Sequence, residues 1–97
     1  MSSKNKIYTK KMHLENSDKM ILHYYLTEKQ GDSGKIYGIE IEKYINKSDK
    51  CIYESNSVTD ISYSPRYTTG LLEKIANGFV TPISLEAVLD NLIDEVS

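Results

Sequence analysis

The chain has 97 residues, of which 39% are hydrophobic and 27% charged, so it can bury a core without help from metals or disulfides. No run approaches the roughly 18 apolar residues of a membrane span, and Met1 to Lys6 lacks the apolar core of a signal peptide. A net charge of −2 gives no general attraction to nucleic acid, and the single cysteine, Cys51, excludes an internal disulfide and is expected to be a small buried hydrophobic residue.

Two runs near the start alternate apolar and polar residues, which is typical of strands with one buried face. They cover residues 6–14 and 20–28. A turn at Asn16-Ser17-Asp18 joins them, and it places Met12 opposite Leu22. We therefore expect the chain to open with an antiparallel strand pair.

The next two strands follow a second hairpin and a further turn. The loop Gly31-Asp32-Ser33-Gly34 is a hairpin connection, and residues 35–45 continue the alternation. This pairing lays the ring of Tyr25 over Gly38, where an aromatic side chain would cover a strand glycine. A fourth strand is predicted over residues 50–58. Its inward face stays open between two pairs, Cys51/Tyr53 and Ile52/Val58.

Two helix starts follow, because a hydroxyl side chain can cap free amides and the proline after it needs no amide partner. Ser64-Pro65 opens a helix over 65–77, and Gly78 is expected to end it in a left-handed conformation. A second helix starts near Thr81 or Ser84 and carries the most regular apolar spacing of the chain. That stripe consists of Leu85, Val88, Leu89, Leu92, Ile93 and Val96.

Together these elements predict an α+β fold, a four-stranded antiparallel β-meander with two C-terminal α-helices packed on one face. We expect a single cytoplasmic domain over residues 1–97, with 1–5 loose, the sheet over 6–58 and the helical pair over 64–96. The predicted core comprises Met12, Leu14, Met20, Leu22, Tyr24, Leu26, Ile39, Ile41, Leu71, Leu72, Ile75, Leu85, Val88, Leu89, Leu92 and Ile93.

The sheet face turned away from the helices is the candidate binding surface. Its expected members are Lys11, Ile21, His23, Tyr25, Glu40 and Tyr44. In the predicted register His23 lies between Lys11 and Glu40. A mixed apolar and polar face rich in tyrosine favours a protein partner or a second copy of the chain, whereas its carboxylates oppose a nucleic-acid backbone.

No pattern of residues indicates catalysis, a cofactor or a metal site. His13 and His23 are the only histidines, and they lack a convergent set of further ligands. Ser64 has no nucleophile-elbow glycines around it, so capping explains it more simply. Asp60 is expected to end the last strand or to accept hydrogen bonds from amides before the first helix.

Four segments carry a resemblance: Tyr24-Tyr25-Leu26-Thr27-Glu28, Tyr37-Gly38-Ile39-Glu40-Ile41, Asp60-Ile61-Ser62-Tyr63, and Val80-Thr81-Pro82-Ile83-Ser84-Leu85 followed by Val88-Leu89-Asp90. The chain resembles a family of small uncharacterised proteins of clostridial-type bacteria. The likeness covers residues 20–96, whereas residues 1–19 match no known pattern. Because the family carries no assigned activity, the resemblance implies a fold class and a cytoplasmic location but no catalytic residue.

The sequence thus favours a non-enzymatic protein-interaction or regulatory module that uses its open sheet face. Nucleic-acid binding through the same tyrosine- and histidine-bearing face is the alternative, and a small enzyme is a third. The expected partner is a protein or a second copy of the chain, with no cofactor and no membrane.

Overall fold

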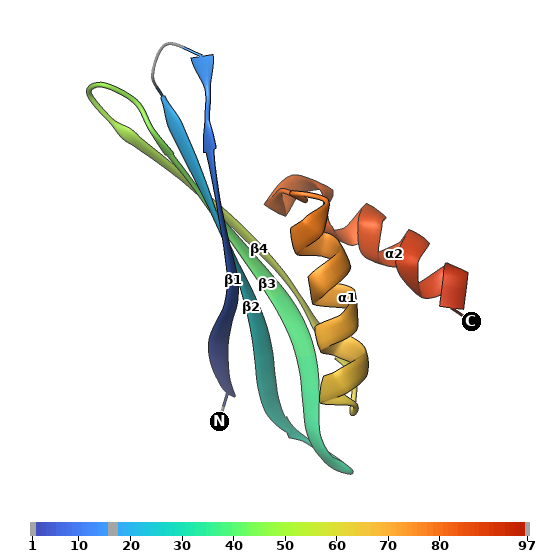
Figure 1. Cartoon of the computed structure of the whole chain (residues 1–97). Helices are drawn as coiled ribbons and strands as arrows, with labels where there is room; N and C mark the ends of the chain where they lie inside the picture. The colour runs from blue at the N-terminus through green and yellow to red at the C-terminus, as the bar shows by residue number, and fades with distance from the viewer. Residues whose placement is uncertain (1, 16–17, 97) are drawn as a thin grey trace.

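The computed structural model describes residues 2–15 and 18–96, and it describes the side chains up to residue 93. It contains four strands followed by helices, which confirms the predicted α+β meander (Figure 1). In chain order the elements are β1 Ser2–His13, β2 Lys19–Gly31, β3 Gly34–Asn46, β4 Cys51–Ser62, α1 Pro65–Asn77, the 3-10 helix η2 Pro82–Ser84, and α2 Leu85–Val96.

The sheet is long and curved, and its strands run in the order β1-β2-β3-β4 with every pair antiparallel. Both helices lie on one side of it (Figure 1). The opposite side, which we call the outer face, has no helix against it among the described residues. This open side of the sheet is where the candidate site lies.

The first hairpin is paired two residues away from the predicted register. Met12 lies opposite Met20, and Leu22 faces Lys10 instead of Met12. The connection is longer than a three-residue turn, since the backbone N–H of Leu14 bonds to the carbonyl of Asp18 at 2.8 Å. From Tyr8 to His13 this shift of two residues keeps every side chain on its face, so the apolar side of that segment was predicted correctly. Asn16 and Ser17 of the predicted turn lie outside the described residues.

The second hairpin also differs by two residues, because its turn holds only Asp32 and Ser33 between the paired Gly31 and Gly34. Gly38 consequently lies opposite Thr27, and Tyr25 lies opposite Glu40. The prediction that Tyr25 covers Gly38 was therefore wrong.

β1 begins at Ser2, whereas residues 1–5 were expected to be loose. β2 is long enough to pair with this segment, and Ser2 lies opposite Lys29. The register shifts between Lys6 and Tyr8, so that Ile7 forms a bulge and leaves its side chain 40% exposed.

β4 extends to Ser62, well beyond the predicted end at residue 58. Val58 pairs with Ile39 and Ser62 with Tyr37, so three residues of β4 oppose the single residue Gly38. Within this bulge Asp60 has a left-handed φ of 59°. The expectation that Asp60 ends the strand was wrong, because β4 continues to Ser62. The carboxylate of Asp60 pairs with Lys29.

The inward face of β4 is the one that carries Ile52 and Val58. Val58 and Ile61 pack against the core, and the side-chain amide of Asn56 donates to the carbonyl of Pro82 at 3.0 Å. Tyr53 and Cys51 point to the outer face and are exposed. The expectation that Cys51 is buried was wrong, because it begins the strand on the uncovered side.

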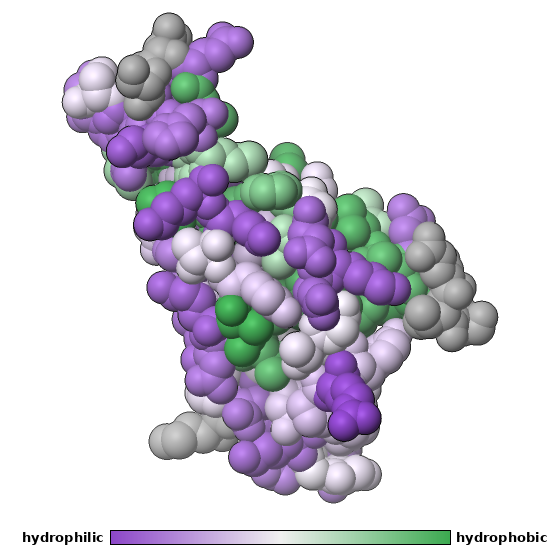
Figure 2. All heavy atoms as spheres, in the orientation of Figure 1, coloured by the Kyte–Doolittle hydropathy of each residue, from purple (hydrophilic) through white to green (hydrophobic). Residues whose placement is uncertain are grey.

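The core lies between the sheet and the helices. Its fully buried members include Leu22, Tyr24, Ile39, Ile41, Leu72, Ile75, Leu85 and Leu89. Burial raises the pKa of Tyr24 to about 12, and its hydroxyl donates to the carbonyl of Val80 at 2.8 Å. Leu14 was predicted to be buried, but it sits at the end of the first hairpin and is 37% exposed. Figure 2 shows hydrophobic side chains gathered over the region of α2.

α1 has the predicted bounds and begins with the predicted cap. The hydroxyl of Ser64 accepts a hydrogen bond from the N–H of Tyr67 at 3.1 Å. At the other end Gly78 has a φ of −87°, and Phe79 takes the left-handed conformation with a φ of 53°. The N–H of Val80 reaches the carbonyl of Ile75 at 3.2 Å, as in a Schellman motif. The left-handed residue thus comes one position later than predicted.

Replacing Ser64 by alanine should lower the free energy of unfolding by about 0.5–2 kcal/mol, because the amide of Tyr67 loses its cap. Denaturant melts would measure this loss. Ser84→Ala is the matched control, since Ser84 is exposed near the start of α2, and should change stability by less than about 0.5 kcal/mol. Equal effects of the two changes would contradict the capping role.

Candidate functional site on the outer sheet face

The outer face collects every candidate residue that the sequence indicated. Lys11, Ile21 and Tyr44 lie side by side across three strands, and Tyr25 lies beside Glu40 four residues further along β2. His23 lies between them on β2, opposite Thr9 and Glu42. The predicted neighbours of His23, Lys11 and Glu40, were wrong, because both registers differ by two residues.

Glu42 is the centre of a hydrogen-bonded cluster on this face. Only 8% of Glu42 is exposed, although no helix of the described residues lies on this face. Its carboxylate accepts a short hydrogen bond from the hydroxyl of Tyr25 and one of 2.9 Å from Tyr53. The ammonium of Lys4 lies 3.6 Å away. Burial alone would raise the pKa of Glu42, but the two hydroxyls and Lys4 outweigh it and hold the pKa below its usual range.

Lys4 ties the cluster to the start of the chain. Its ammonium lies 2.6 Å from the carboxylate of Glu40 and 4.4 Å from the centre of the Tyr25 ring. The hydrogen bond to Glu40 is the largest contribution that raises the pKa of Lys4. The ring of Tyr25 is therefore fixed from both sides, by Glu42 at its hydroxyl and by Lys4 over its face.

A row of rings continues across the face from His23. The centroids of His23 and Tyr44 are 5.6 Å apart at an edge-on angle of 68°, and those of Tyr44 and Tyr53 are 4.9 Å apart. The hydroxyl of Thr9 lies 3.1 Å from Nδ1 of His23. Burial and the nearby charge of Lys6 lower the pKa of His23, which keeps its ring mainly uncharged at neutral pH.

Sequence reasoning missed Lys4 and Tyr53 as members of the site. Lys4 belongs to the segment that was expected to be loose, and the orientation of Tyr53 depended on the undecided face of β4. Glu42 lies between the candidates Glu40 and Tyr44 on β3 but was not itself a candidate. Alternation along β3 places it on the same face as Glu40 and Tyr44, but its central role depends on partners from β1 and β4.

The arrangement is suited to binding through fixed rings. Both carboxylate oxygens of Glu42 already accept hydrogen bonds, and the rings of Tyr44 and Tyr53 remain available on the surface. Within the described part of the chain, no three His, Cys, Asp or Glu side chains gather in a way that could hold a metal ion. Also within residues 2–15 and 18–96, no helix has the length and apolar character to cross a membrane.

Alkaline pH should weaken the fold through Tyr25. Burial and the hydrogen bond to Glu42 raise the pKa of Tyr25 to about 12, whereas an unfolded tyrosine loses its proton near about 10. Between these values the folded state binds the proton more tightly, so the free energy of unfolding should fall as the pH rises.

Denaturant melts at steps between about pH 8 and about pH 12 would measure this fall. Tyr25→Phe should remove part of it and leave the part due to Tyr24, whose pKa burial also raises to about 12. Parallel pH profiles for the wild type and Tyr25→Phe would contradict the raised pKa.

Fold and face together define an α+β protein, an antiparallel meander backed by helices on one side and bearing a fixed aromatic cluster on the other. The chain belongs to the family of unknown function DUF6514, which matches residues 3–95. The match includes most of the segment 1–19, where the sequence alone had shown no resemblance. No curated protein and no solved structure matches the chain.

Proposed function

We propose that this chain is a cytoplasmic, non-enzymatic protein-interaction module that binds its partner on the outer sheet face. The observation that supports this most strongly is the fixed position of the tyrosines. Tyr25 and Tyr53 both donate to the nearly buried carboxylate of Glu42, on a side of the sheet where no helix of the described residues lies. Rings that are already immobilised lose little conformational entropy on binding, and tyrosine is enriched where protein surfaces meet.

The charges on this face favour a particular kind of partner. Lys6 and Lys11 are exposed on β1, and neither forms an ion pair within the described part of the chain. Ile21 lies opposite Lys11, and Tyr44 lies beyond Ile21 in the same row; both side chains are half-buried. A complementary surface would be apolar opposite Ile21 and Tyr44, with carboxylates opposite the lysines.

A different protein fits this requirement better than a second copy of the chain. An identical face would bring the same lysines, Lys6 and Lys11, to the contact, while Glu40 and Glu42 beside them already pair with Lys4. Nucleic acid fits less well, because Glu40 and Glu42 lie on the face and would repel phosphate groups.

The test is the double substitution Ile21→Lys with Tyr44→Ser. It removes an apolar anchor and adds a charge that the contact would have to desolvate, while leaving the hydrogen bonds of Glu42 in place. The variant should lose a stoichiometric partner that the wild type captures from a native lysate, at a temperature well below its melting point. Binding should also weaken as salt is added, since Lys6 and Lys11 contribute charge.

The matched control is Glu86→Gln with Asp90→Asn, two exposed positions on α2, away from the outer face. The control should bind like the wild type, and nuclease treatment should change nothing. Loss of binding in the control alone would assign the contact to α2. Nuclease-sensitive recovery would assign the face to nucleic acid, and a concentration-dependent dimer without another protein would show self-association; each result would overturn the proposal.

A further inference from the structure

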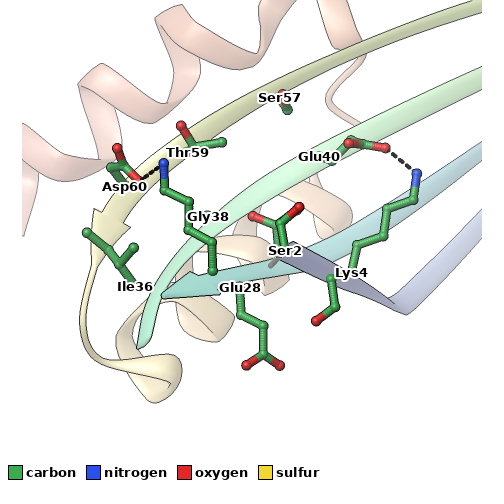
Figure 3. Close-up of a pocket in the computed structure, with 12 residues that line it drawn as sticks. Ser2, Lys4, Glu28, Ile36, Gly38, Glu40, Ser57, Thr59 and Asp60 are labelled. Carbon is green, nitrogen blue, oxygen red and sulfur yellow. Dashed lines mark hydrogen bonds and ion pairs between the residues drawn. The ribbon is translucent and has the colours of Figure 1, made fainter. Parts of the chain in front are cut away.

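A groove with a volume of about 340 Å³ crosses the outer face where the bulge of β4 meets Gly38. We call it the Gly38 groove; Gly38 forms its floor, the pair Lys4–Glu40 one end and the pair Lys29–Asp60 the other. Figure 3 shows Lys4 and Glu40 on one side of Gly38 and Asp60 on the other. It receives side chains from all four strands. Apart from Lys4 and Glu40, its residues take no part in the aromatic cluster described above.

The bulge in β4 creates one wall of this groove. Alternation would send Thr59 and Asp60 to opposite faces, but the three-residue bulge turns both toward the groove, while Val58 and Ile61 keep their places against the core. In this orientation the backbone of Asp60 adopts a left-handed φ of 59°. A non-glycine residue in that conformation persists only where the surrounding structure holds it.

Gly38 creates the floor. A Cβ atom at this position would lie 2.4 Å from the carbonyl oxygen of Val58 and 2.8 Å from Oγ1 of Thr27. The position therefore requires glycine, because the backbone of β4 and the hydroxyl of Thr27 approach the Cα of Gly38 too closely for any side chain. Bulges and strand glycines recur where a ligand approaches the backbone.

The charges at the two ends are balanced. The ammonium of Lys29 lies 2.9 Å from the carboxylate of Asp60, and the ammonium of Lys4 lies 2.6 Å from the carboxylate of Glu40. Both lysine side chains are 43% exposed, so water and solutes reach these pairs. Between them lie the hydroxyl groups of Thr27, Ser57 and Thr59.

These features narrow the chemical class of a ligand. Each lysine already has a carboxylate beside it, which disfavours a bare phosphate or another simple anion. The described lining includes no aromatic ring on which a nucleobase could stack. The volume lies near the lower limit for small-molecule pockets, which range over roughly 300–1,000 Å³. A small molecule that carries one ammonium and one carboxylate matches both ends.

We propose that the Gly38 groove binds a small zwitterion of amino-acid or dipeptide size. Asp60 at one end of the groove offers its carboxylate to the ligand's ammonium, and Lys4 at the other end offers its ammonium to the ligand's carboxylate. The hydroxyls between them complete the hydrogen bonding of the ligand. This proposal stands independently of the protein-binding role of the aromatic cluster.

The test is an amide-resolved NMR titration of the full chain with the dipeptide Ala-Ala at millimolar concentrations. The expected result is a saturable shift of the amides of Gly38 and Thr59. The same dipeptide with an acetylated amino end and an amidated carboxyl end should bind at least about tenfold more weakly, because it has lost both charges. Equal shifts with the blocked dipeptide, or no saturable shift with Ala-Ala and with free alanine, would overturn the proposal.

The Asp60→Asn variant tests whether Ala-Ala binds in the groove and not at other charged positions of the surface. Asparagine tolerates the left-handed conformation, so the bulge should persist while the charge is lost. Binding of Ala-Ala should weaken about tenfold. Glu54→Gln is the matched control, because Glu54 is also an exposed carboxylate in an ion pair, 3.3 Å from the ammonium of Lys43, and lies outside the groove. An equal loss in both variants, or no loss in Asp60→Asn, would contradict the assignment.

Discussion

Leu89→Ala should lower the free energy of unfolding by about 2–5 kcal/mol, the range for truncating a buried leucine. Leu89 is 2% exposed and belongs to the buried cluster between the helices and the sheet. Its loss leaves a cavity that the neighbouring side chains fill only in part. Because folded domains of this kind are stable by only about 5–15 kcal/mol, the change should be plain in denaturant melts.

Ile83→Ala is the control for this prediction. Ile83 lies in η2, a few residues before Leu89, and is 84% exposed. Removing an apolar side chain that is already in water should change stability by less than about 0.5 kcal/mol. If Leu89→Ala were as mild as Ile83→Ala, α2 would not pack against the sheet as the structure shows.

Gly38→Ala should destabilise the protein by about 1–3 kcal/mol or more, which is the cost of forcing extra atoms into a packed region. The added Cβ would approach the carbonyl oxygen of Val58 to 2.4 Å and the Cα of Thr59 to 2.9 Å. Both are backbone atoms, so β4 itself would have to move. The bulge at Asp60 should be the first part of the sheet to change.

Gly70→Ala provides a control of the opposite sign. Gly70 lies within α1, and a Cβ atom there would meet nothing within 4 Å. Alanine should therefore stabilise the helix by about 0.5–1 kcal/mol through its higher helix propensity. Thermal or denaturant melts of both variants would measure the difference. Destabilisation by Gly70→Ala, or no effect of Gly38→Ala, would contradict the packing described here.

Local sequence signals predicted both helices, and for α1 they predicted the correct bounds. Ser64 and Pro65 act within one turn, and the apolar stripe of α1 repeats over a few residues. Such features depend on neighbours along the chain. The prediction for the C-terminal end of α1 was less accurate. The left-handed residue is Phe79 and not Gly78, and this places the N–H of Val80 against the carbonyl of Ile75.

Strand faces were predictable, whereas strand register was not. Alternation specifies which side Leu22 or Ile41 faces, but a slip of two residues preserves that side. The actual offsets depend on the lengths of the two turns. In β4 the polar residues around Thr59 and Asp60 do not alternate with apolar ones, so no sequence pattern indicates the bulge.

The candidate site was predictable to the same extent as the faces. Alternation placed Ile21, His23, Tyr25 and Tyr44 together on one side of the sheet. The cluster around Glu42 needed β1 and β4 to be in their final positions, because Lys4 and Tyr53 come from opposite edges of the sheet. Contacts of this kind join residues far apart in the chain, and no local pattern indicates them.

The sequential strand order also has a consequence for how the chain reaches its folded state. Each strand pairs with the strand that precedes it, so the sheet forms by closing short loops and should assemble quickly. The helices that cover Leu22, Tyr24, Ile39 and Ile41 come last in the chain. During synthesis these apolar side chains therefore emerge from the ribosome before their cover does. A chain interrupted ahead of Pro65 would display them to solvent, with the exposure to aggregation and proteolysis that this brings.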